Sequence, residues 1–154
     1  MPHIQKVNLF SAASAQSTRD NPSFQLILQG HSTGRRLKGR KLVDQYMFGY
    51  RYVLLASNDM AHEEVLHIYL LDAELNVIDE MSLSQPYTPG LYEPRRNSGR
   101  HLEFRFFDEG TWCLEIRQTP KHAPLNNDQF PVNRPLKLWG KQYLNLEKVN
   151  PEVA

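Results

Sequence analysis

A strict alternation of polar and apolar residues over His101–Phe106 is the feature that most limits what this chain can fold into. A half-buried strand sorts such residues onto two faces, whereas a helix would scatter them around its circumference. The alternation resumes after a break that contains Gly110, so the two runs are typical of an antiparallel hairpin. The residues expected on its buried face are Leu102, Phe104, Phe106, Trp112, Leu114 and Ile116.

Other segments also indicate strands. Val65–Leu71 and Val77–Leu83 flank a short polar break and predict a second hairpin. Further extended segments are expected at 3–10, at 24–28, at 46–56 as one strand with Gly49 in a bulge, and at 136–146 as one kinked strand or a pair.

No segment of ten or more residues combines helical periodicity with caps, which leaves a fold made of strands. A chain of 154 residues has the length of one domain. We therefore predict a single all-β domain over residues 1–154, an antiparallel β-sandwich or partly open β-barrel of about eight strands. Two long Pro-rich loops, 84–100 and 118–135, join its strands, and 11–22 and 149–154 are expected to be flexible or irregular.

Charge is unevenly distributed although the net charge is only +1. Between Tyr52 and Tyr92 there is no Lys or Arg, whereas 30–51 holds six cations and one acid. The acidic residues of the first window are Asp59, Glu63, Glu64, Asp72, Glu74, Asp79 and Glu80. Two interpretations stay open: cross-strand pairs that favour a register, or a bipolar surface that attracts charged partners.

The cellular compartment is constrained by two features. The only cysteine, Cys113, excludes an intramolecular disulfide framework, which favours a reducing compartment. The amino terminus lacks the apolar core of a signal peptide, and no window reaches the roughly 18 consecutive apolar residues of a membrane span. These patterns predict a cytoplasmic protein without a membrane partner.

The sequence contains no complete motif for catalysis or metal binding. Gly34 and Gly39 have the spacing of a phosphate-binding loop, but Arg40 and Lys41 replace its Lys and Ser or Thr. His62 and His67 are five apart, where a zinc-protease helix needs four. Cys113 has no neighbouring cation to activate its thiol, and adjacent carboxylates on a strand point to opposite faces. We therefore assign no catalytic residue, no metal ligand and no cofactor.

The remaining functional signal lies in two segments expected to be loops, 30–41 and 87–100. Flexible cations can meet phosphates or carboxylates, and Tyr and Arg are typical of recognition surfaces. The candidate binding residues are Arg35, Arg36, Lys38, Arg40, Lys41, Tyr87, Tyr92, Arg95 and Arg96.

These residues favour a non-catalytic binding or interaction module for an anionic ligand or an acidic protein. The first alternative is a small enzyme on a β scaffold, with His and carboxylate side chains converging from separate strands. The second is a nucleic-acid-binding β-barrel, which the long acidic window disfavours. Association between copies of the chain also fits a bipolar charge distribution.

Overall fold

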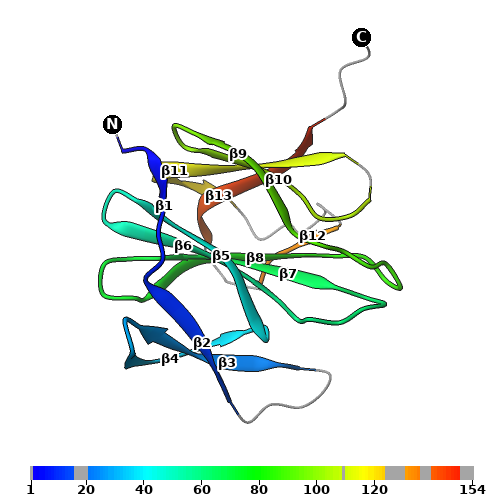
Figure 1. Cartoon of the computed structure of the whole chain (residues 1–154). Coiled ribbons are helices and arrows are strands. Elements are labelled where there is room, and N and C mark those ends of the chain that lie inside the picture. The colour runs from blue at the N-terminus through cyan, green and yellow to red at the C-terminus, as the bar shows by residue number, and fades with distance from the viewer. Residues whose placement is uncertain (1, 16–20, 109, 124–130, 136–139, 150–154) are drawn as a thin grey trace.

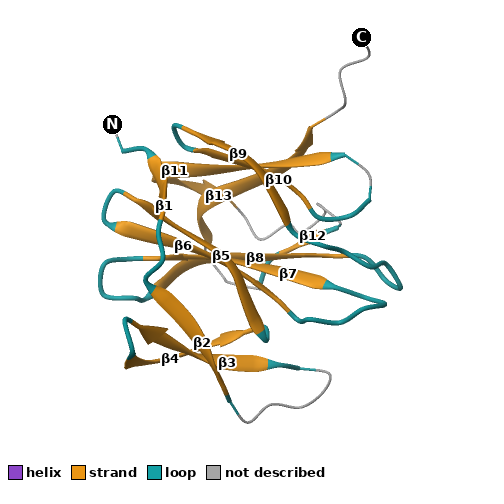
Figure 2. Ribbon diagram, viewed as in Figure 1, coloured by secondary structure: helices purple, strands orange, loops and turns teal. Residues whose placement is uncertain are grey.

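The chain folds into three stacked β-sheets (Figures 1 and 2). The computed structural model describes residues 2–15, 21–108, 110–123, 131–135 and 140–149. Within these ranges there are thirteen strands and no helix. The expected all-β class is confirmed, and the open, stacked sheets make the architecture a β-sandwich rather than a closed barrel.

The middle layer is a six-stranded sheet in the order β1-β5-β6-β7-β8-β12, with antiparallel neighbours. Its strands are β1 (Ile4–Lys6), β5 (Lys41–Phe48), β6 (Arg51–Ser57), β7 (Val65–Leu71), β8 (Val77–Ser84) and β12 (Val132–Asn133).

Each face of this central sheet is covered by a smaller sheet. One outer layer has the order β13-β11-β10-β9, formed by β9 (Glu93–Ser98), β10 (His101–Arg105), β11 (Thr111–Ala123) and β13 (Gly140–Val149). The other has the order β2-β3-β4, formed by β2 (Phe10–Ser14), β3 (Ser23–Leu28) and β4 (His31–Lys38). Figure 1 shows the two outer layers above and below the central one.

The three layers enclose two hydrophobic cores. Alternate residues of β6 divide between them, with Val53 and Leu55 in one core and Leu54 and Ala56 in the other. Both faces of β6 and β7 are therefore buried, and this explains their nearly continuous apolar sequences.

The two predicted hairpins are confirmed. β10 and β11 pair antiparallel, and all six residues expected on their inner face are buried. β7 and β8 pair antiparallel across the break at 72–76. The strand expected around 24–28 is β3.

The prediction of one strand over 46–56 is wrong. β5 and β6 form a hairpin there, and its turn lies at Gly49 and Tyr50. Gly49 has a φ of 62°, a left-handed value that a glycine adopts without steric cost and that closes the turn. The expected bulge is therefore a reversal of the chain.

The predicted loops 30–41 and 87–100 are wrong in part, because each contains an edge strand. β4 occupies most of the first and β9 six residues of the second, and this raises the number of strands above the expected eight. All six residues of β9 are exposed, so no apolar alternation marks it in the sequence. On β4 only Leu37 is buried.

The remaining expectations are met unevenly. Residues 11–14, expected to be irregular, belong to β2, whereas 16–20 and 150–154 lie outside the described residues. The kinked strand or pair of strands expected over 136–146 corresponds to one strand, β13, from Gly140 onward, and 136–139 lie outside the described residues. In the described part, no helix has the length and apolar character needed to cross a membrane.

Candidate functional site

A polar strip crosses the central sheet beside the small outer sheet. Tyr69 and Leu71 on β7 are buried in the core under that outer sheet, whereas Glu80 and Ser82 on β8 are only partly buried. β4 is the last strand of the small sheet. The central sheet continues from β7 through β8 to β12. Glu80, Ser82 and Asn133 on these last two strands have polar side chains.

A pocket of about 210 Å³ lies on this strip, and we call it the polar pocket. It is lined by Lys38, His67, Glu80, Met81, Ser82, Asn133, Arg134 and Pro135. His67, Ser82 and Asn133 stand opposite one another on β7, β8 and β12, because His67 pairs with Ser82 and Ser82 pairs with Asn133. The antiparallel register therefore assembles three polar side chains from distant parts of the sequence.

His67 is a partly buried titratable group of the pocket. Its Nε2 lies 2.8 Å from Asn58 Oδ1, and its ring stacks on that of Tyr69 with centroids 6.2 Å apart. Burial and then the charge of Lys38 lower the pKa of His67 to about 4. The imidazole is neutral at pH 7, so Nε2 donates to Asn58 and Nδ1 is the acceptor of the ring.

Lys38 reaches the pocket from the end of β4. The Tyr69 hydroxyl donates to its backbone oxygen at 2.9 Å, and this ties β4 to the central sheet. The next residue, Gly39, has a φ of 119°, and a side chain there would lie 3.0 Å from the Cβ of Ala56. The turn therefore sits close on the central sheet and holds the end of β4 beside His67.

Lys38 and Glu80 carry opposite charges and line the same pocket, yet they form no ion pair with each other. Among the described residues neither their charged ends nor the Ser82 hydroxyl has a hydrogen-bond partner. The Lys38 ammonium, the Glu80 carboxylate and the Ser82 hydroxyl are therefore able to form hydrogen bonds with a ligand.

Arg134 also borders the pocket, but its guanidinium is engaged. It donates to Asp79 Oδ1 at 2.7 Å and to the backbone oxygen of Leu144. The other oxygen of Asp79 accepts the amides of Tyr143 and Leu144, both at 2.9 Å. This arrangement connects β8 to β13 and holds Arg134 at the border of the pocket.

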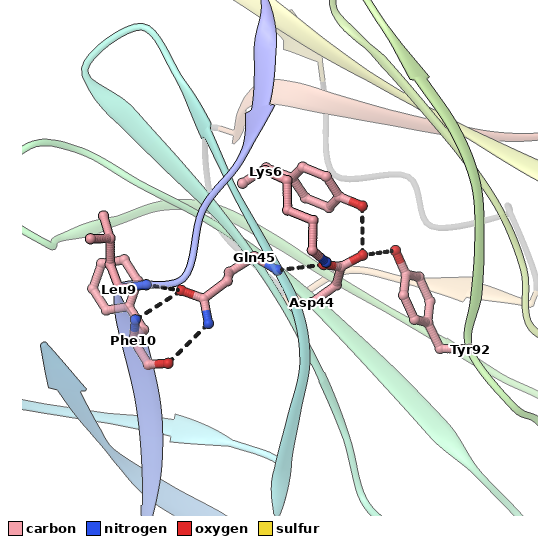
Figure 3. Close-up of polar contacts among 7 residues, drawn as sticks. Lys6, Leu9, Phe10, Asp44, Gln45 and Tyr92 are labelled. Atoms are coloured by element: carbon pink, nitrogen blue, oxygen red, sulfur yellow. Dashed lines mark hydrogen bonds and ion pairs between the residues drawn. The ribbon is translucent and has the colours of Figure 1, made fainter. Parts of the chain in front are cut away.

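A second polar cluster is centred on β5 and holds the three layers in register (Figure 3). Asp44 accepts the Tyr46 and Tyr92 hydroxyls at 2.5 and 2.6 Å and pairs with Lys6. Burial, followed by the bond to Asp44, raises the pKa of both phenols. The next side chain, Gln45, bonds the backbone at the start of β2, and its Oε1 accepts the Phe10 amide at 2.8 Å.

The nine candidate binding residues do not form one surface. Arg35, Arg36 and Lys38 lie on β4, Arg40 in the following turn and Lys41 at the start of β5. Arg95 and Arg96 lie on β9, in the opposite outer layer (Figure 1).

Several of these residues have partners within the fold. Arg35 donates to Asn76 Oδ1 at 2.7 Å, Arg36 to Ser23 Oγ at 2.8 Å, and Arg96 pairs with Glu103 at 3.2 Å. Arg95 pairs with Glu93 at 3.6 Å, and Tyr92 bonds Asp44. Tyr87 is 90% exposed with a φ of 55°. Of the nine, Lys38 is the one that lines the polar pocket.

The other pocket residues were missed by sequence reasoning. His67 is the only imidazole inside the apolar run of β7, and a polar residue in a strand buried on both faces is a signal worth following. Glu80 and Ser82 share a parity on β8, which places them on one face. Asn133 gives no signal of its own, because its position depends on the pairing of β12 with β8.

A metal site is not formed by the described residues, where no three His, Cys, Asp or Glu side chains converge suitably. Burial is the main cause that raises the pKa of the Cys113 thiol, so this residue is not an activated nucleophile. Comparisons with family models, curated proteins and solved structures returned no match.

Proposed function

We propose that this protein is a non-catalytic binding module whose polar pocket receives the anionic group of a ligand. The observation that carries the proposal is Lys38, an exposed residue that lines the pocket and whose ammonium has no partner among the described residues. Its positive charge acts on the pocket residue His67, because it contributes to the low pKa of that imidazole. The Ser82 hydroxyl supplies a second donor beside it.

The pocket volume limits what can enter. Sites for drug-sized molecules enclose about 300–1,000 Å³, and this pocket encloses about 210 Å³. The ligand is therefore a small carboxylate or phosphate, or an acidic side chain presented by a protein partner.

The free thiol of Cys113 fits a reducing compartment, and we propose that the protein is cytoplasmic.

An enzyme is the second candidate, and one observation favours it. His67 and Glu80 converge on the pocket from β7 and β8, as that alternative requires. However, a general base works best with a pKa near the working pH. The pKa of His67, about 4, leaves the imidazole a weak proton acceptor at pH 7, so we rank binding above catalysis.

The test is a titration of the 15N-labelled protein with sodium acetate, sodium phosphate and a Glu-containing peptide, followed by NMR, with sodium chloride at equal ionic strength as the blank. We expect saturable shifts at residues 38, 67, 80 and 82. Lys38→Gln should weaken binding about tenfold or more, since a hydrogen bond to a charged group contributes about 1.5–3 kcal/mol. Lys41→Gln is the matched control, because Lys41 is exposed and does not line the pocket.

The three probes separate the possible sources of the anion. Binding of acetate or phosphate alone indicates a free small ligand, whereas binding of the peptide alone indicates an acidic protein partner. Equal affinities of the wild type and Lys38→Gln for every probe would refute the proposal, as would shifts that never saturate.

A further inference from the structure

Glu80 adds a negative charge to the polar pocket, which Lys38 lines with a positive one. It stands opposite Tyr69 in the β7–β8 register and is partly buried. Its charge is the second cause, after burial, that raises the pKa of the Tyr69 phenol. The carboxylate therefore lies close enough to influence Tyr69, whose ring stacks on that of the pocket residue His67.

The separation of Glu80 from Lys38 has a structural cause. Glu80 belongs to the central sheet, whereas Lys38 ends the edge strand of an outer sheet. The bond from the Tyr69 hydroxyl to the Lys38 oxygen and the close packing of Gly39 fix where the lysine stem begins. The two residues therefore line one pocket from different layers.

Opposite charges that line one pocket, here the exposed Lys38 and the partly buried Glu80, favour a ligand that carries both. A plain carboxylate satisfies Lys38 and adds a repulsive charge beside Glu80. A ligand with an ammonium group as well gives each charge a partner, and charge-assisted hydrogen bonds are about twice as strong as neutral ones. Asn133 completes the wall, and its Nδ2 donates to Ser84 Oγ at 3.3 Å.

We propose that the ligand of the polar pocket is a zwitterionic amino-carboxylate, with its carboxylate on Lys38 and its ammonium on Glu80. This inference rests on the proposed function, since it assigns the ligand class of the same site. The small pocket volume of about 210 Å³ favours a free amino acid or a comparably short amino-carboxylate.

The experiment compares ligands of one series on the same NMR titration. Acetate, methylammonium, glycine, β-alanine and 4-aminobutyrate are titrated into the wild type and into Glu80→Gln, Lys38→Gln and Glu63→Gln. Glu63 is an exposed acid that does not line the pocket, so Glu63→Gln is the matched control. The three amino-carboxylates differ in length and so measure the spacing between the two charges.

We expect one member of the amino-carboxylate series to bind the wild type and Glu63→Gln at least tenfold more tightly than acetate does. Glu80→Gln should lose this advantage and bind acetate as well as the wild type or better. Lys38→Gln should weaken acetate and the preferred amino-carboxylate alike. Amide spectra of each variant without ligand report whether it is folded.

Two results overturn the inference while the proposed function stands: acetate binds but no amino-carboxylate binds more tightly, or the advantage persists in a folded Glu80→Gln. If neither acetate nor any amino-carboxylate binds, the inference fails, and the phosphate and peptide titrations then decide the proposed function. If Glu80→Gln does not fold, Glu80→Asp replaces it, and an unchanged preference for the same chain length counts against the inference.

Discussion

Two sets of charged groups differ in their hydrogen-bond partners. One set is the buried carboxylates of Asp44 and Asp79, and the other is the pocket charges of Lys38 and Glu80. The side chain of Asp44 is 1% exposed and that of Asp79 5%, and each accepts several hydrogen bonds. Lys38 and Glu80 make no such bond among the described residues. A buried charge without hydrogen-bond partners destabilises the folded state, so Asp44 and Asp79 need partners within the protein. Lys38 and Glu80 keep access to solvent and can therefore bind a ligand.

The largest effect is expected at Asp79. Asp79→Ala removes the ion pair between Asp79 and Arg134 and the acceptor of two β13 amides, and breaking such a buried pair costs about 3–5 kcal/mol. Urea unfolding measures the change. Arg134→Met is the comparison and should cost less, because the β13 amides keep Asp79. Equal costs would show that the ion pair, rather than the backbone contacts, determines the effect.

His67 should give the next effect, through pH. Its pKa in the folded state is about 4, below the ordinary 6.5, so the unfolded chain takes up the proton first as the pH falls. The stability from a neutral His67 is complete above pH 6.5 and is lost as the pH falls to 4, by roughly 3 kcal/mol in total.

The measurement is urea unfolding of the wild type and His67→Gln between pH 7 and 4. The difference between the two isolates His67 from carboxylates that titrate in the same range. The wild type should lose more stability than the variant over this window. Parallel curves would show that His67 is accessible to protons in the folded state and is not a buried neutral group.

Asp44→Ala comes third, because it removes the acceptor of two phenols and costs about 1.5–3 kcal/mol in urea unfolding. Lys6→Gln is the control. The Lys6 side chain is 63% exposed, and surface ion pairs contribute about 0–1 kcal/mol. If Lys6→Gln loses as much stability as Asp44→Ala, the ion pair with Lys6, rather than the hydrogen bonds from the phenols, is the main stabilising contact of the cluster.

The sequence predicted the fold best where one face of a strand is buried and the other is not. The hairpin of β10 and β11 has that pattern, and both strands were found. On β6 both faces are buried, so the alternation disappears, and β5 and β6 were merged into one predicted strand. β9 fails for the opposite reason, because both of its faces are exposed.

The candidate site was largely beyond sequence reasoning for a different reason. Lys38 was identified as a cation, but its neighbours His67, Glu80 and Asn133 come from three other strands. Their proximity follows from strand order and register, which depend on contacts between distant segments rather than on local spacing. The same holds for Asp79 and Tyr143, which are 64 positions apart in the chain.

The smallest stability change is expected for the pocket charges. Lys38→Gln and Glu80→Gln should each alter the free energy of unfolding by no more than about 0.5 kcal/mol, since neither group holds the fold together. Lys38→Gln should nevertheless raise the pKa of His67, because the removed positive charge is one cause of its depression. NMR titration of the imidazole measures this shift, with Lys41→Gln as the control. A large loss of stability in either pocket variant would place that charge with Asp44 and Asp79 as part of the framework. An unchanged His67 pKa in Lys38→Gln would instead put the ammonium outside the pocket.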